Sequence, residues 1–156
     1  MSIHVCTFFG HRQCPESIRS ELRKVLIDLI EKQNVTMFYV GRNGAFDRIV
    51  RSVLRELSKK YPRIRYAVVL ERIPEKTGAD FSDTVFPEGL ENVPPRFAID
   101  HRNRWMLGQA DYVVTYVRHP GGAEKYAELA ARHGKTVVPL ASRVQPEGFD
   151  LQSIPF

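Results

Sequence analysis

The chain contains few cysteines and no long apolar run. Only 2 of its 156 residues are cysteine, which is too few for a disulfide framework and is typical of a reducing, cytoplasmic setting. No segment approaches the roughly 20 consecutive apolar residues that a membrane-spanning helix needs. The first residues lack a basic segment, a long apolar stretch and a small-residue cleavage site, so we expect no secretory signal.

Familiar catalytic and cofactor-binding motifs are also missing. Neither G-x-G-x-x-G nor G-x-x-x-x-G-K-[ST] occurs, which excludes the ordinary dinucleotide fingerprint and the P-loop. No serine or cysteine lies at motif spacing from a base, so nothing indicates nucleophilic catalysis. Cys6, His11 and Cys14 match no standard zinc-ligand spacing, and Cys6 lies within an apolar run. We expect neither a metal ion nor a cofactor.

Positive charge is concentrated in the first half of the chain. Lysine and arginine number 23 against 18 acidic residues, giving a net charge of +5. The first 76 residues carry 15 basic and 8 acidic side chains, whereas the remaining residues carry 8 and 10. This excess indicates an anionic partner, and it does not distinguish nucleic acid from a small phosphorylated ligand.

Short apolar runs alternate with amphipathic segments along the chain. Apolar runs that end at glycine or proline are typical of buried strands, and apolar residues three and four apart are typical of helices. The order strand–helix–strand–helix–strand predicts a single α/β domain over residues 1–156: a Rossmann-like open, mainly parallel sheet with helices on both faces. The expected strands are 3–9, 36–40, 64–70, 112–117 and 136–140, and the expected helices are 15–30, 46–57, 98–110 and 122–133.

Residues 71–97 interrupt this alternation. Four prolines and two glycines in this stretch disfavour any long regular element. A segment of this length inside a compact domain is usually a lid, a binding loop or an interface element. It also holds apolar residues that need cover from the domain or from a second subunit, namely Phe81, Val85, Phe86 and Leu90.

Glycine-containing loops follow the first, second and fourth expected strands, and each carries an arginine. Because parallel strands end at the same edge of a sheet, these loops should lie together beside helix N-termini. Glycine lets the backbone approach a ligand closely, and free N–H groups at a helix start favour phosphate or carboxylate. The sequence therefore predicts an anion-binding site at this edge. The alternative is that these glycines only form the turns that connect each strand to the next helix.

Further polar residues lie beside these loops. Asp47, in the first turn of its helix, either compensates the helix dipole or contacts a ligand. Arg102 and Asn103 either face the cleft or lie on a solvated helix face. His11 and His119 have side chains that titrate near neutral pH. The candidate ligand-binding residues are Gly10, His11, Arg12, Gly41, Arg42, Asn43, Gly44, Asp47, Asn103, Arg118, His119, Pro120, Gly121, Gly122 and Ala123.

Several of these motifs resemble those of one known superfamily. Residues 8–12 are similar to the opening T-G-H-R motif of bacterial SLOG-superfamily proteins, and residues 102–106, 110–114 and 121–123 resemble later motifs of the same branch. The resemblance covers most of the chain, from Cys6 to about Leu140. It implies a bacterial or phage protein with a Rossmann-like sheet that binds a nucleotide or a nucleotide-derived molecule, often as a sensor. It also implies a homodimer.

A more distant resemblance bears on catalysis. Residues 120–128 are similar to the P-G-G-x-G-T-x-x-E loop of the LOG phosphoribohydrolases, which places Glu128 at the position of the catalytic glutamate. Arg102 matches a catalytic arginine of these enzymes, but Asn103 stands where they have lysine. Glu124 and Lys125 replace the Gly-Thr pair. The resemblance implies a catalytic pair of Arg102 and Glu128; the alternative is that Glu128 is a solvated carboxylate.

Three functions remain open on the sequence alone. The first is a module that binds a small nucleotide-type ligand. The second is an enzyme that cleaves the N-glycosidic bond of a nucleoside monophosphate. The third is nucleic-acid binding through the arginines 48, 51 and 55 of the second helix, although no stacking aromatic residues lie between them.

Overall fold

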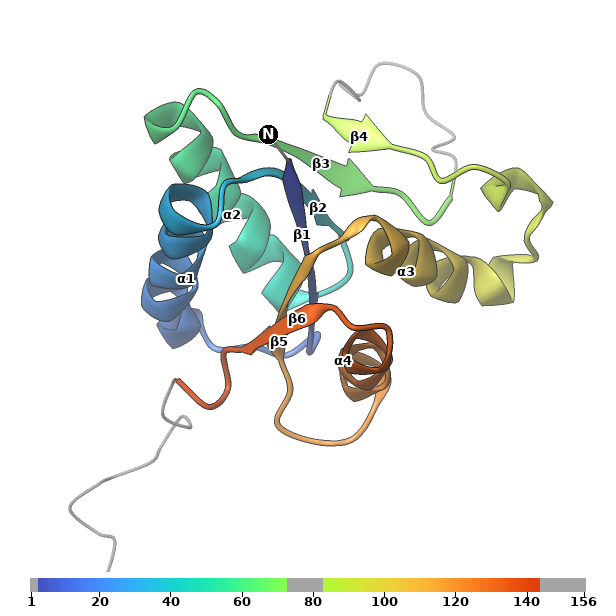
Figure 1. The fold of residues 1–156 in the computed structure, drawn as a ribbon. Helices are drawn as coiled ribbons and strands as arrows, with labels where there is room; N and C mark the ends of the chain where they lie inside the picture. The colour runs from blue at the N-terminus through green and yellow to red at the C-terminus, as the bar shows by residue number, and fades with distance from the viewer. Residues whose placement is uncertain (1–2, 73–82, 144–156) are drawn as a thin grey trace, which may run out of the picture.

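A single sheet of six parallel strands organises the chain, as the computed structural model shows (Figure 1). The structure describes residues 3–72 and 83–143. The strands follow the spatial order β4-β3-β2-β1-β5-β6, and every neighbouring pair is parallel. Helices cover both faces of this sheet. The predicted Rossmann-like α/β fold is therefore confirmed.

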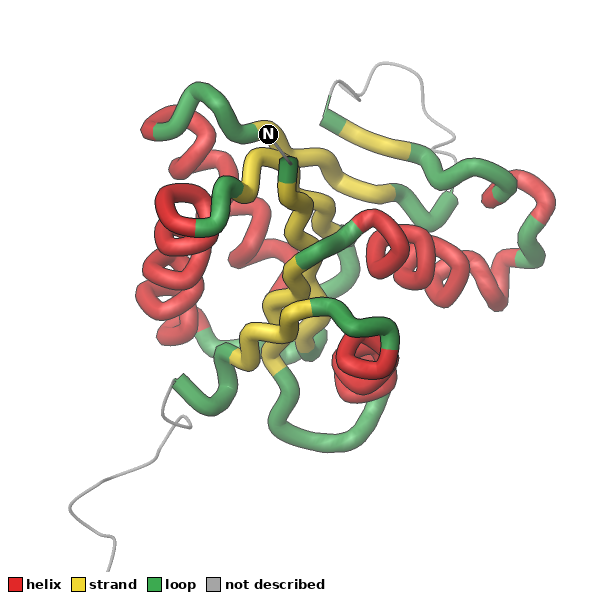
Figure 2. Tube along the Cα trace, viewed as in Figure 1, coloured by secondary structure: helices red, strands yellow, loops and turns green. Residues whose placement is uncertain are grey.

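Strands and helices alternate along the chain except at β3 and β4, which follow one another, and the strands form the central layer (Figure 2). Gly134, just beyond α4, has φ = 75°, so it takes the left-handed conformation expected at a helix C-terminus. The strands are β1 (His4–Gly10), β2 (Val35–Val40), β3 (Arg65–Val69), β4 (Thr84–Val85), β5 (Tyr112–Tyr116) and β6 (Thr136–Pro139). The α-helices are α1 (Arg19–Lys32), α2 (Ala45–Lys60), α3 (Ala98–Gln109) and α4 (Gly122–Arg132), with single 3-10 turns η1 (Glu16–Ile18), η2 (Leu90–Asn92) and η3 (Pro95–Phe97).

The segment 71–97 contains one strand that the sequence did not indicate. Thr84 and Val85 form β4, which pairs with the end of β3 and completes the sheet on that side. A strand of two residues is too short to show any alternation of apolar and polar residues. Leu90 is buried, whereas Val85 and Phe86 are half-buried. Phe81 lies outside the described residues.

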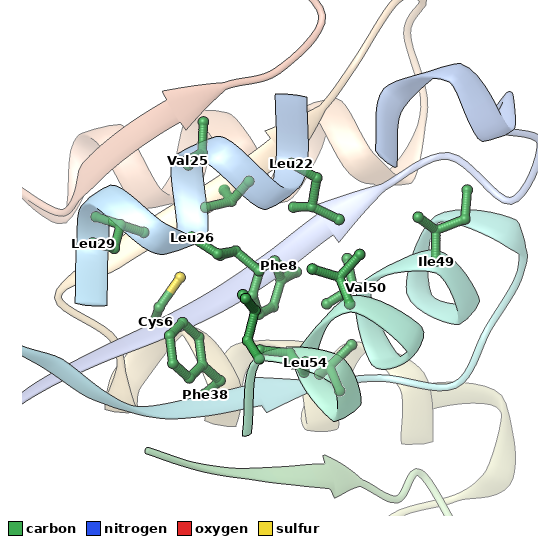
Figure 3. Packing of buried hydrophobic residues seen from close by; sticks show 14 of the residues in the cluster. Cys6, Phe8, Leu22, Val25, Leu26, Leu29, Phe38, Ile49, Val50 and Leu54 are labelled. Carbon is green, nitrogen blue, oxygen red and sulfur yellow. The ribbon is translucent and has the colours of Figure 1, made fainter. Parts of the chain in front are cut away.

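The larger hydrophobic core lies between the sheet and the helices α1 and α2, which cover one face (Figure 1). Leu22 and Leu26, four residues apart on α1, point toward Phe8 of β1 (Figure 3). Val50 and Leu54 of α2 approach the same ring, and all five side chains are fully buried. Helical spacing of the apolar residues thus produces the contact that fixes both helices on the sheet.

A second cluster fills the space between the opposite face and the helices α3 and α4. Phe9, which follows Phe8 and therefore points to the other face of β1, stacks on Tyr126 of α4 with ring centroids 5.2 Å apart. Met106 and Leu107 of α3 are buried beside it. β1 is therefore buried on both faces, as its continuous apolar run predicts.

The connections diverge on either side of β1. The chain passes from β1 to β2 across α1, and on the other side of β1 lies β5, which joins β6 through α4. Loops that leave the carboxyl ends of β1 and β5 run to opposite faces of the sheet, and a crevice opens between them. This is the topological switch point, where open α/β sheets bind their ligands.

Within residues 3–72 and 83–143, no helix combines the length and the apolar character that crossing a membrane would require.

Candidate functional site

A cleft of about 660 Å³ opens at this switch point. It brings together the β1–η1 loop, the loop before α2, the first turn of α3, and the first turn of α4. Segments far apart in the sequence thus meet at one place, as the glycine-containing loops predict. Its walls are formed by Phe8, Phe9, Gly10, His11, Arg12, Gln13, Asn43, Asp47, Ile99, Asp100, Arg102, Asn103, Met106, His119, Gly122, Ala123, Lys125 and Tyr126.

The loops after β1 and β2 are in direct backbone contact. The N–H of Ala45 donates to the carbonyl of Arg12 at 2.7 Å. Gly44 has φ = 97°, and a Cβ there would lie 2.5 Å from the Cα of Arg12, so only glycine fits at this position. The Arg12 side chain is exposed at the cleft and makes no hydrogen bond or ion pair with any described residue.

Arg102 is buried at the floor of the cleft, with 3% of its surface exposed. Its Nε donates to Oδ1 of Asn103 at 3.0 Å, and its Nη1 donates to Oδ1 of Asn43. The same Nη1 lies 3.4 Å from Oε2 of Glu71 at the end of β3. Of the two interpretations of Arg102 and Asn103, the structure supports a position in the cleft, and both are buried there.

Asp47 is the second buried charge beside the cleft, with 8% of its surface exposed. Its Oδ2 accepts a hydrogen bond from the N–H of Asn43 at 3.0 Å, so the carboxylate closes the loop that precedes α2. Burial raises the pKa of Asp47 to about 6, although that hydrogen bond and the charge of Arg102 oppose the rise. A Cβ on Gly41 would lie 2.8 Å from this carboxylate and 3.1 Å from the Arg102 guanidinium.

His11 and His119 stack at the mouth of the cleft. Their ring centroids are 3.8 Å apart and the rings are nearly parallel, at 4°. Nε2 of His11 accepts a hydrogen bond from the backbone N–H of Arg118 at 2.7 Å. Burial lowers the pKa of His11, and the nearby charges of His119 and Arg118 lower it further. The neutral form of His11 is therefore favoured at neutral pH.

Four polar residues that line the cleft were not among the predicted site residues, namely Gln13, Asp100, Lys125 and Tyr126. Asp100 in the first turn of α3 accepts hydrogen bonds from Tyr126 and, at 3.2 Å, from Lys125. Although burial opposes it, these bonds and one from Arg104 lower the pKa of Asp100 to about 2. One signal could have identified Asp100: the helix before a parallel strand begins at the carboxyl edge of the sheet, so its first turn faces the switch point.

Two of the three loop arginines turn away from the cleft. Arg42 forms a hydrogen-bonded pair with Glu71, with N–O distances of 3.0 to 3.1 Å. Nε of Arg118 donates to the Tyr116 hydroxyl at 2.8 Å, and its guanidinium lies 5.3 Å from the centre of that ring. Neither side chain lines the cleft. Arg42 pairs with a residue that follows β3, and Arg118 bonds the last residue of its own strand β5, so of the three loop arginines only Arg12 lines the cleft.

The remaining candidates are divided between the cleft and its surroundings. Gly122 and Ala123 line the cleft at the start of α4, whereas Pro120 and Gly121 lie in the exposed loop before it. Glu128 lies six residues, or about 1.7 turns, beyond Gly122 on an exposed part of α4. Its side chain is 61% exposed and lies 3.9 Å from Arg132. Arg102 lines the cleft, whereas Glu128 is not among the described residues that line it.

The three arginines of α2 differ in their contacts. Arg48 forms an ion pair with Glu16 at 3.1 Å. Arg51 is half-buried, and its Nη1 lies 3.4 Å from the carbonyl oxygen of Gly41. Arg55 is exposed. Two of the three cations that would contact nucleic acid are thus engaged within the domain.

The described part of the chain contains no group of three or more histidine, cysteine, aspartate or glutamate side chains that could hold a metal ion. Both cysteines are free thiols. Burial raises the pKa of Cys6, and burial together with the nearby Glu16 raises the pKa of Cys14 to about 12. Neither cysteine is therefore a thiolate at neutral pH.

Fold and cleft together define a Rossmann-like α/β domain with a cleft of mixed apolar and polar lining at the switch point of its sheet. A scan against models of known protein families and a search of curated proteins found no match to the chain.

Proposed function

We propose that this protein binds a nucleotide or a nucleotide-derived small molecule in the cleft between β1 and β5. The proposal rests on the position and contacts of Arg12. It lies at the cleft, and no described residue forms an ion pair with its guanidinium. An arginine that the fold leaves uncommitted at a switch point is suited to form charge-assisted, bidentate hydrogen bonds with a phosphate.

The first turn of α4 supports a phosphate position beside Arg12. Gly122 and Ala123 begin the helix and line the cleft, and the N–H groups of a first helical turn have no partner within the helix. Their direction and the helix dipole favour an anion. A Cβ on Gly122 would meet no atom within 4 Å, so the space in front of the backbone is open.

The rest of the cleft suits the uncharged part of such a ligand. Ile99, which is 37% exposed, presents apolar surface to a planar base. Asp100, Asn103 and Tyr126 provide acceptors and donors within the same cleft. A cleft with one anion-binding subsite and otherwise mixed apolar and polar walls has the composition that a nucleotide requires.

We propose binding rather than cleavage because Glu128, the second catalytic group of the enzyme hypothesis, is not among the described residues that line the cleft. Glu128 lies on exposed helix surface and is not part of the cleft. Incubation with nucleoside monophosphates should therefore release no free base. Release that disappears in Glu128→Ala would contradict this proposal and favour the N-glycosidase.

Arg12→Ala tests the phosphate subsite. Calorimetry with nucleoside mono-, di- and triphosphates and ADP-ribose should identify a ligand of the natural chain, and mass spectrometry should detect it in the purified protein. We expect the variant to bind this ligand about ten- to a hundredfold more weakly, because a charge-assisted hydrogen bond contributes about 1.5–3 kcal/mol.

Arg55→Ala is the matched control, since Arg55 is exposed on α2 and does not line the cleft. It should bind like the natural chain. Equal weakening in both variants would show that only overall charge matters. Absence of binding by the natural chain to every compound would refute the proposed function.

Gly122→Ala tests the backbone side of the same subsite. The added methyl group has room in the ligand-free protein. It also reduces the conformational freedom of the unfolded chain, so we expect the free energy of unfolding to stay equal or to rise by about 0.5–1 kcal/mol. The methyl group would nevertheless block close approach of a phosphate to the helix start. Ligand affinity, measured by calorimetry, should fall about tenfold.

Gly108→Ala provides the control on α3. A Cβ at Gly108 also meets nothing within 4 Å, and Gly108 lies outside the cleft. This variant should gain similar stability and keep its full affinity. If Gly122→Ala also keeps full affinity, the phosphate does not approach the start of α4.

A further inference from the structure

His11 connects the first strand to the loop between β5 and α4. Its ring is stacked on His119 on one side and meets Tyr116 edge-on, at 5.8 Å and 79°. Its Nε2 accepts the N–H of Arg118. Because a backbone N–H can only donate, this bond requires a neutral imidazole with its proton on Nδ1.

The loop that His11 contacts carries one wall of the cleft. Residues 117–121 connect β5 to α4 and precede the cleft-lining Gly122 and Ala123. His119 and Arg118, the two residues in contact with His11, are exposed. The stack and the hydrogen bond to His11 are thus contacts that join this exposed loop to the buried end of β1.

We propose that His11, in its neutral form, is a positioning residue that holds the β5–α4 loop and the start of α4 at the cleft, and that protonation of His11 releases the loop. The proposal deepens the proposed function by adding regulation of the same site by pH. Its structural part concerns the protein without ligand and can be tested separately.

The observed arrangement of the loop is compatible with neutral His11 and incompatible with protonated His11. A protonated Nε2 is a donor and would face the N–H of Arg118, so the hydrogen bond would be lost. The imidazolium would also lie against His119 and beside Arg118, which carry or can carry positive charge. β5 contributes the Tyr116 ring, and α2 contributes the uncharged Phe46 ring that stacks on Tyr116.

The carboxylates of the cleft have other partners. Asp47 accepts the Asn43 N–H, and Asp100 accepts Tyr126, Lys125 and Arg104. The charges that act on His11 are therefore those of His119 and Arg118, and both disfavour its protonation. Release of the loop consequently requires a pH below the ordinary pKa of histidine, about 6.5.

Amide hydrogen exchange of the ligand-free protein tests this role at the Arg118 N–H. We expect the protection factor of this amide, which is corrected for the intrinsic effect of pH, to fall about tenfold or more between about pH 7.5 and about pH 5. His11→Gln supplies a side-chain carbonyl that accepts the N–H and does not titrate, so protection should persist at both pH values. His11→Phe retains a ring for stacking but no acceptor, so protection should be low at both.

His133→Gln is the control, because His133 lies at the far end of α4. In this variant the protection factor of the Arg118 amide should follow that of the natural chain at both pH values. Unchanged protection of Arg118 in His11→Phe, or a full pH response in His11→Gln, would overturn the positioning role. If the amide behaves as expected and no nucleotide binds, the positioning role stands and the proposed function fails. If a nucleotide binds with the same affinity at both pH values in the natural chain, the regulatory part fails alone.

Discussion

Replacement of Arg102 by alanine is expected to lower the free energy of unfolding by about 3–5 kcal/mol, because it leaves buried charges without their partner. Arg102 donates to Asn43 and Asn103, and its charge lies beside Glu71 and Asp47. Removal of the guanidinium also leaves a cavity at the cleft floor. Urea denaturation at neutral pH, followed by circular dichroism, measures the change.

Arg104→Ala is the matched control on the same helix. Arg104 is half exposed and pairs with Asp100 at 2.9 Å, and exposed ion pairs contribute only about 0–1 kcal/mol. An equal loss of stability in the two variants would mean that Arg102 contributes as little as a surface pair, contrary to its burial.

Asp47→Asn is expected to change the pH dependence of stability. The folded chain raises the pKa of this carboxyl from 3.8 to about 6 by burial, so the folded state holds the proton more tightly than the unfolded state. The stability of the natural chain therefore falls as pH rises from about 4 to 6 and loses about 3 kcal/mol from this group above that window. Asparagine stays neutral and keeps a side-chain oxygen for the Asn43 N–H.

The difference between the variant and the natural chain isolates this effect. Below about pH 4 the two should be equally stable, and at neutral pH the variant should be the more stable by up to about 3 kcal/mol. Thermal or urea unfolding at a series of pH values measures the difference. Asp28→Asn, at an exposed pair with Lys32, should show no comparable trend. A variant that is less stable than the natural chain at neutral pH would mean that the ionised Asp47 is a net stabilising partner of Arg102.

The sequence was sufficient to predict the layered fold because its signals are local. The apolar run before Gly10 predicted β1, and the spacing of Leu22 and Leu26 predicted α1. The two-residue β4 has no periodicity of its own and forms only because β3 offers an edge for pairing. β4 therefore forms because of its pairing within the sheet and not because of the local sequence of its segment.

The site was predicted in position but only partly in detail. The loops after β1 and β5 do meet, because strand direction alone brings their ends to one edge. The contact of Arg42 was not predictable, since its partner Glu71 follows a different strand, and Arg118 was not expected to bond the Tyr116 hydroxyl two residues before it. Only the packing of α3 against the sheet distinguishes a buried Arg102 from a solvated one.

The separation of the two halves of the cleft along the chain has a consequence for how the protein folds. The hydrogen bond from Thr7 to β2 joins residues 32 apart, whereas that from Arg118 to His11 joins residues 107 apart. Closing the longer loop costs about 1 kcal/mol more conformational entropy. The pairing of β1 with β2 is thus the nearer step in folding, and the cleft is completed only when β5 joins them. A bound ligand would therefore stabilise contacts that form late in folding. It would slow the departure of β5 and α4 during unfolding more than it speeds the first steps of folding.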